Sequence, residues 1–161
     1  MAVELQVTEA TETYGMLRST LSQLHELLAR EMEDEVGMPF ERYSILLMLA
    51  QADGGALRPS ELADALPITP SGVTRLIDRL ERDRVVERRA CATDGRGTVV
   101  ALTADGTEVF RRAGRVHLRG INEHLGTNLT VSEMAELRRI MTKLAAGIQA
   151  TKPETHGAER N

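Results

Sequence analysis

The chain has 161 residues and a net charge of −4, and this length suits one compact domain or two small lobes that share a dimer interface. It contains no apolar run long enough to cross a bilayer and no signal-peptide pattern, so we expect a cytoplasmic protein without membrane contact. The single cysteine, Cys91, excludes an internal disulfide and a zinc site built from cysteines, and the scarcity of aromatic residues argues against stacking on single-stranded nucleic acid.

Apolar residues recur every three or four positions through most of the chain, which is the period of amphipathic helices. Six helices are predicted, over about residues 9–35, 39–52, 59–65, 69–83, 104–125 and 131–149. Two strand-like segments, 85–89 and 98–102, lie between the fourth and fifth helices. The polar tail after residue 150 is expected to be disordered. The fold class is therefore mainly α with a small β-hairpin.

The fourth helix has two contrasting faces. Its apolar residues Val73, Leu76, Ile77 and Leu80 share one wedge, and the opposite face carries Ser71, Thr74, Arg75, Asp78, Arg79 and Arg82. Thr69 and Pro70 have the pattern of an N-cap and a first helical residue. A short helix, a turn at 66–68 and this helix together predict a helix-turn-helix, although an ordinary amphipathic surface helix would show the same two faces.

The positive charge of the chain is concentrated in its middle. Residues 1–57 carry a net charge of −7, whereas residues 58–115 carry +2 with eleven arginines and no lysine. Arginine suits bidentate contacts with phosphates and guanine edges, although it also serves in surface ion pairs. The middle of the chain is therefore the candidate nucleic-acid interface.

The hairpin that follows the fourth helix resembles a DNA-binding wing. Gly95 and Gly97 flank Arg96, so the tip can turn tightly and the arginine can project into a narrow minor groove. Asp94 would repel phosphate, so we expect it to hold Arg96, or else Arg88 or Arg89, through a charge-assisted hydrogen bond. A generic glycine hairpin with a solvated charge pair is the alternative.

These segments resemble the multiple antibiotic resistance regulator (MarR) family. Asp94-Gly95-Arg96, followed by Leu102-Thr103 and Gly106, is similar to the D-x-R … L-T-x-x-G wing signature of that family. SELADAL (60–66) and TPSGVTRLIDRLERDRVVERR (69–89) precede it in the order and spacing of the family, and the resemblance spans about residues 10–150. It implies a winged helix-turn-helix, an obligate homodimer, and repression or activation relieved by a small ligand or oxidant.

The resemblance also implies a set of DNA contacts. Ser71, Thr74 and Arg75 would face the major groove, and Arg96 would enter the minor groove. Arg58 departs from the family pattern, because members often place a Ser or Thr cap there; it would alter the start of the third helix or add a phosphate contact. The full predicted DNA-binding set is Arg58, Ser60, Thr69, Pro70, Ser71, Gly72, Thr74, Arg75, Arg79, Arg88, Asp94 and Arg96.

Long apolar stripes on the first and last helices favour a homodimer, because exposed stripes of this size mark interfaces. Packing of these two helices on each other within one chain is the alternative. The predicted domains are an N-terminal dimerisation helix (1–35), a winged helix-turn-helix (36–103), C-terminal dimerisation helices (104–150) and a tail (151–161). The two-fold symmetry of a dimer predicts a pseudo-palindromic operator.

No metal or cofactor is expected. His117 and His124 are seven residues apart, whereas metal-binding pairs on a helix stand three or four apart. A redox role for Cys91 has little support, because it lies beside the wing rather than in the N-terminal region where peroxide-sensing members of the family carry their cysteine. His25 is placed to border a cleft for a small aromatic or phenolic effector, a ligand class that the resemblance implies.

The predicted function is a ligand-responsive regulator, more specifically a repressor, that binds double-stranded DNA. An enzyme is disfavoured, because the sequence contains no phosphate-binding glycine loop, no HExxH and no paired-cysteine motif. A helical adaptor that binds protein instead of DNA is the alternative.

Overall fold

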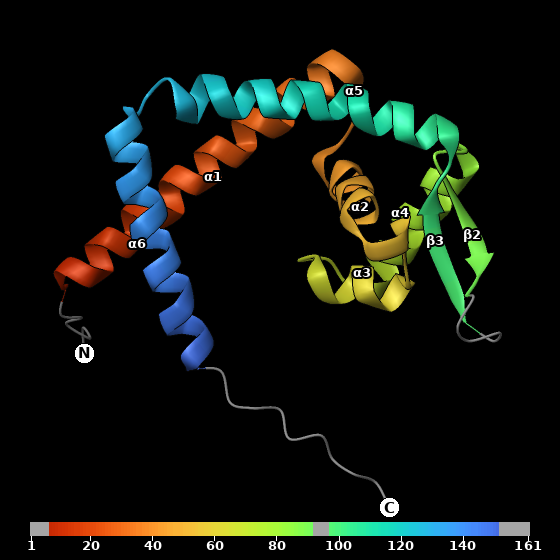
Figure 1. Ribbon diagram of the computed structural model, residues 1–161, viewed down its shortest axis with the longest axis horizontal. Helices are drawn as coiled ribbons and strands as arrows, with labels where there is room; N and C mark the ends of the chain where they lie inside the picture. Colours follow the sequence, from red (N-terminus) through yellow and green to blue (C-terminus); the bar gives the residue numbers. More distant parts are fainter. Residues whose placement is uncertain (1–6, 92–96, 152–161) are drawn as a thin grey trace, which may run out of the picture. The chain divides into compact units, whose positions relative to one another are not determined.

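The computed structural model describes residues 7–91 and 97–151. The chain divides into two compact units, residues 1–120 and 121–161. The elements in chain order are α1 (Glu9–Val36), α2 (Phe40–Gln51), the 3-10 turn η1 (Asp53–Gly55), β1 (Ala56–Leu57), α3 (Pro59–Ala65), α4 (Pro70–Arg82), β2 (Val86–Ala90), β3 (Thr98–Leu102), α5 (Ala104–Ile121), the π-helical turn η2 (Asn122–Gly126) and α6 (Val131–Ala150) (Figure 1).

All six predicted helices form, and both predicted strands pair. The fifth helix departs from the prediction at its end: regular α-helix stops at Ile121, and the next turn, Asn122–Gly126, is π-helical. Residues 152–161 of the predicted disordered tail (151–161) and the tip of the hairpin at 92–96 lie outside the described residues. No helix in the described part of the chain has the length and apolar character needed to cross a membrane.

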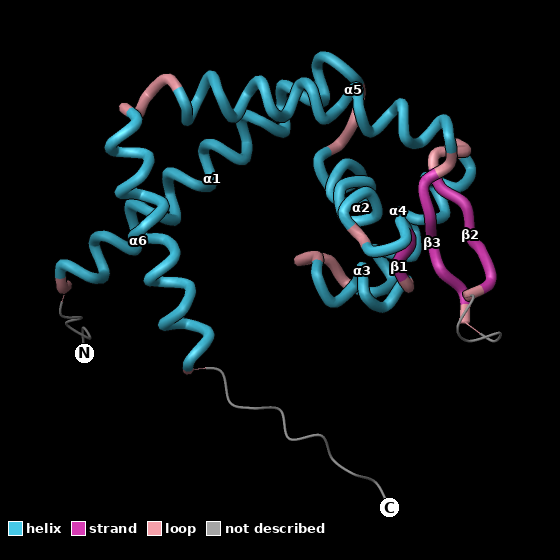
Figure 2. The backbone as a smooth tube through the Cα atoms, viewed as in Figure 1, coloured by secondary structure: helices cyan, strands magenta, loops and turns pink. Residues whose placement is uncertain are grey.

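The hairpin is part of a three-stranded antiparallel sheet in the order β1-β3-β2 (Figure 2). The strand β1 was not predicted from the sequence; it has only two residues and pairs Ala56 with Ala101 and Leu57 with Val100. On the other side of β3, β2 pairs from Val86↔Leu102 to Ala90↔Thr98. The central strand β3 is therefore held from both sides, which gives the hairpin a fixed base.

The core of the first unit forms where α2, α3 and α4 meet the sheet. The predicted apolar face of α4 is confirmed, since Val73, Ile77 and Leu80 are fully buried and Leu76 is half-buried. The other buried side chains of this core are Met32, Met38, Tyr43, Ile45, Leu46, Leu49, Leu62, Val85, Val86, Val100 and Ala113. Burial on one face fixes the rotation of α4 about its axis and leaves its polar face in solvent.

The residues that connect the hairpin to α5 are held by a close contact with the start of β2. The Thr103 hydroxyl donates a hydrogen bond of 2.7 Å to the carbonyl oxygen of Arg84 and accepts one of 2.9 Å from the amide of Gly106. A Cβ atom at Gly106 would overlap the carbonyl oxygen of Val85. The L-T-x-x-G pattern is therefore explained by packing, because only glycine lets the first turn of α5 approach this backbone.

We expect Gly106→Ala to destabilise the first unit by more than about 2 kcal/mol, because backbone must move to admit the methyl group. Gly114→Ala is the matched control on the same helix. Its Cβ would meet the Tyr43 hydroxyl at an ordinary 3.7 Å, and the gain in helix propensity makes it neutral or stabilising. Urea unfolding measures both variants, and equal stabilities would contradict this account of the junction.

Candidate nucleic-acid interface

The helix-turn-helix consists of α3, a turn at 66–69 and α4 (Figure 1). Thr69 caps α4: its side chain accepts a hydrogen bond of 3.2 Å from the amide of Gly72. Pro70 occupies the first helical position, where its missing N–H leaves no bond unmade. The predicted start of the helix is confirmed, and its N-terminal end lies at the surface, where the helix dipole favours an anion.

The outward face of α4 is polar along its whole length. Ser71, Thr74 and Arg75 are exposed, and the Thr74 hydroxyl donates a hydrogen bond of 3.0 Å to the carbonyl of Pro70. Arg75 and Arg79 are exposed and form no ion pair with any residue that the structure describes. This face therefore presents small hydroxyl groups near its start and available guanidinium groups further along.

Arg58 lies between the helix-turn-helix and the base of the wing. Its amide donates a hydrogen bond of 2.6 Å to Glu61, which caps α3 from inside the helix in place of a Ser or Thr cap. Its guanidinium donates to the Cys91 sulfur at 3.8 Å and packs against Gly97, where an added Cβ would lie 3.1 Å from Nη1. Ser60 is exposed two residues further on.

The described part of the wing consists of β2, β3 and the residues that close them. The amide of Cys91 donates a hydrogen bond of 2.8 Å to the carbonyl of Gly97, which closes the base of the hairpin. Asp94 and Arg96 lie outside the described residues. The contacts predicted for these two residues therefore stay predictions.

Arg88 forms two ion pairs within the protein. Its Nη2 donates to Asp78 Oδ1 at 2.7 Å, and its Nη1 donates to Glu81. The hydrogen bond with Asp78 raises the pKa of Arg88, and the charge of Glu81 acts in the same direction against the effect of burial. Both acids lie on α4, so one arginine of the wing joins the two predicted DNA-binding elements. Arg89, the next residue, pairs with Glu87 on its own strand.

A surface pocket of about 480 Å³ lies beside α4, between this helix and the start of α2. Arg42, Arg75 and Arg79 line it together with apolar Leu76 and Ile68. Arg42 also pairs with Asp83 at the end of α4 and so joins α2 to that end. Sequence reasoning missed this arrangement, because its residues come from distant segments and have no common motif.

A cluster of aromatic and histidine rings joins α1, α2 and α5. His25 meets Phe40 edge to face with ring centroids 4.4 Å apart, and His117 lies 5.5 Å from Phe40 and 5.1 Å from Tyr43. Burial lowers the pKa of His117, and the nearby His25 acts in the same direction. Its Nδ1 atom is buried without a hydrogen-bond partner among the described residues. Both effects favour the neutral form of His117.

Comparison with known proteins places this architecture in a family. A protein-family sequence model described as "MarR family" matches residues 36–97. The HTH-type transcriptional repressor Rv2887 of Mycobacterium tuberculosis is 30% identical over 69% of this chain and 78% of its own length. A MarR family transcriptional regulator from Streptomyces coelicolor, Sco3205, solved in complex with DNA, superposes with a TM-score of 0.77 at 29% identity and 97% coverage of both chains.

The chain belongs to the MarR family. Its members are transcriptional regulators, so the predicted regulator class and the winged helix-turn-helix fold are confirmed, whereas the enzyme and adaptor alternatives find no support. The multiple antibiotic resistance protein MarR of Salmonella typhimurium is 31% identical over 56% of this chain. That match spans 62% of the Salmonella protein, less than two thirds of its length.

The lowered pKa of His117 in this MarR family protein predicts a pH dependence of stability. Below the ordinary value of 6.5, the unfolded chain binds a proton that the folded state resists. The stability that neutral His117 contributes is therefore present above that pH. It is lost as the pH falls towards the lower pKa that His117 has in the folded state. We expect the free energy of unfolding to decrease between about pH 7 and pH 5, and to decrease less in His117→Phe. Urea unfolding at both pH values measures this, and identical pH dependences would contradict it.

Proposed function

We propose that this protein is a dimeric, ligand-responsive repressor that binds pseudo-palindromic double-stranded DNA. The observation that carries the proposal is the outward face of α4, on which exposed hydroxyl and guanidinium groups follow a capped N-terminus. The DNA complex of the Streptomyces regulator and the repressor name of the Mycobacterium relative support it. A DNA partner also favours the cytoplasm as its location.

In this proposal α4 lies in the major groove. Ser71, Thr74 and Arg75 face the base edges and the adjacent backbone, because they lie on the exposed face near the start of the helix. The Ser71 amide and the positive end of the helix dipole bind a phosphate at this N-terminus, whereas Pro70 has no N–H and the Gly72 amide is already bonded to the Thr69 side chain. Arg79 lies one turn further along and contacts the phosphate backbone.

The remaining predicted contacts flank α4. Ser60 binds backbone phosphate from the exposed start of α3, and Arg58 does so from the base of the wing. Arg96 enters the minor groove, held by Asp94. The structure gives Arg88 a different environment from the others, because two carboxylates already occupy its guanidinium group.

We expect Arg75→Ala and Arg96→Ala each to weaken binding to an operator duplex by about 1–3 kcal/mol. Arg82→Ala is the matched control, since it removes the same charge from the C-terminal end of the same exposed helix face. Affinity should also fall steeply as salt rises, because phosphate contacts release counterions. Fluorescence anisotropy with the DNA upstream of the protein's own gene measures both effects. If the unmodified protein shows no sequence preference in DNA binding, the proposal is rejected.

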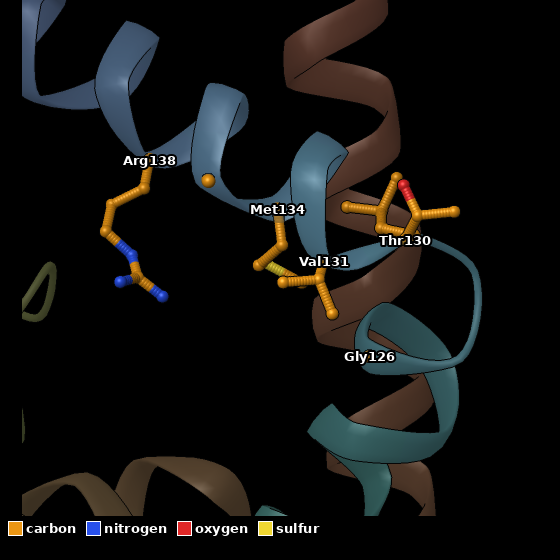
Figure 3. Close-up of a pocket in the computed structure, with 7 residues that line it drawn as sticks. Gly126, Thr130, Val131, Met134 and Arg138 are labelled. Atoms are coloured by element: carbon orange, nitrogen blue, oxygen red, sulfur yellow. The ribbon is translucent and has the colours of Figure 1, made fainter.

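The dimer is proposed to form through exposed apolar side chains of the terminal helices. In the second unit, α6 has no buried residue among those described, and Ile140 and Leu144 are 47% and 44% exposed. Val131, Met134 and Arg138 project from one side of this helix, at a pocket of about 350 Å³ (Figure 3). On α1, Tyr14, Met16 and Leu21 are more than half exposed. A single chain leaves this apolar surface in water, whereas a second copy would cover it.

The proposed roles of the segments follow the predicted domains. Residues 1–35 and 104–150 form the dimer region, and residues 36–103 form the DNA-binding lobe. The two-fold axis then presents two copies of α4 to half-sites about ten base pairs apart. A small aromatic or phenolic effector is proposed to act near His25, in the ring cluster that joins α1 to α2.

We expect Leu144→Glu to shift the protein from dimer to monomer, because it places a charge in the proposed apolar interface. Lys143→Glu is the control, since it changes the neighbouring exposed residue on the same helix. Analytical ultracentrifugation measures the mass of each. A monomeric unmodified protein, or a Leu144→Glu variant that remains fully dimeric, would contradict the interface.

A further inference from the structure

The wing and α4 are tied together by one side chain. Arg88 stands in β2, opposite Val100 of the central strand, and its side chain is 30% exposed. Its Nη2 donates to Asp78 and its Nη1 to Glu81, so each carboxylate has its own nitrogen of the guanidinium group. Asp78 and Glu81 are three residues apart on α4 and therefore neighbours on its surface.

Arginine is suited to such a bridge, in which one side chain of β2 binds two carboxylates of α4. Its guanidinium group is planar and rigid, so two separate hydrogen bonds fix the direction of the side chain as well as its distance from the helix. A lysine has a single ammonium centre on a flexible stem and could not hold both carboxylates in the same way. The bridge therefore restricts the angle between β2 and α4.

The charges around Arg88 argue against a phosphate contact. Two carboxylates surround one guanidinium group, so the cluster carries a net negative charge that repels DNA phosphate. Arg75, on the same helix as both acids, has no such partner among the described residues. The environments of the two arginines therefore predict different roles.

We propose that Arg88 is a positioning residue that sets the angle of the wing against α4, so that both DNA-binding elements are presented together. This inference rests on the proposed DNA-binding function. A duplex that contacts two elements at once favours a protein in which their relative orientation is already fixed, because the cost of ordering them on binding is avoided. Removing the bridge lowers DNA affinity by loosening this orientation.

The free energy of unfolding is expected to change little in variants that remove this bridge, because partly exposed ion pairs contribute little to stability. DNA affinity changes more: Arg88→Met and the double variant Asp78→Asn/Glu81→Gln each weaken operator binding about tenfold. A triple variant that combines Arg88→Met with Asp78→Asn and Glu81→Gln binds DNA no more weakly than Arg88→Met alone, because all three side chains act through one bridge. Arg88→Lys, which keeps the charge, binds DNA with an affinity between those of the unmodified protein and Arg88→Met.

The salt dependence separates positioning from direct contact. A phosphate ligand contributes about one unit to the slope of log affinity against log salt, whereas a positioning residue leaves that slope unchanged. Arg111→Met is the matched control, since it breaks an exposed arginine–carboxylate pair with Glu108 on α5 and should leave affinity unchanged. A slope reduced by about one in Arg88→Met, or an Asp78→Asn/Glu81→Gln variant that binds DNA more tightly than the unmodified protein, would overturn the inference.

Hydrogen exchange tests the bridge without DNA. The amides of β2 should exchange faster in Arg88→Met and in Asp78→Asn/Glu81→Gln, by the same factor, and unchanged exchange in both variants would overturn the positioning role. If the unmodified protein fails to bind DNA, the proposed function fails, and exchange still decides whether Arg88 restrains the wing. If it binds DNA but the variants bind equally well, only the role of Arg88 fails.

Discussion

The burial of one face of α4 is the constraint on which the proposed interface depends. Val73, Ile77 and Leu80 are fully buried against side chains of α2, α3 and the sheet, and full burial of each such side chain is worth about 1.5–3 kcal/mol. Turning the helix by half a turn would expose them and place Arg75 in the core. The same helical period that fills the core therefore fixes which residues face outward. The polar face needs no separate mechanism to orient it.

Ion pairs then determine which arginines are available to a partner. The middle of the chain is rich in arginine, but Arg88, Arg89 and Arg111 each pair with an acid close by. Arg75 and Arg79 form no ion pair with a described residue and lie on the exposed face of α4. The number of arginines in a segment therefore overstates its basic surface. Only the pairing pattern shows where a phosphate would meet an uncompensated charge.

The chain combines a well-packed lobe with apolar helical surface that its own core does not bury. Residues 1–120 contain the whole cluster of buried core side chains, whereas α6 exposes Leu137, Ile140 and Ile148. A helix with this apolar pattern is stabilised chiefly by what packs on it. The proposed dimer and the proposed DNA contact are linked, because a surface that joined two copies would also set the spacing of the two copies of α4.

The sequence by itself determined the six helices, and the N-cap and the two faces of α4, because these depend on residues three or four positions apart. It also predicted β2 and β3 and the family, from a motif that is continuous along the chain. The tertiary structure alone decided the pairing of β1, the bridge from Arg88 to Asp78 and Glu81, and the place of Arg58 against Gly97. It likewise showed why Gly106 must be glycine, since the obstructing atom is the carbonyl oxygen of Val85. Each of these depends on segments that only folding brings together, and no local period or propensity records them.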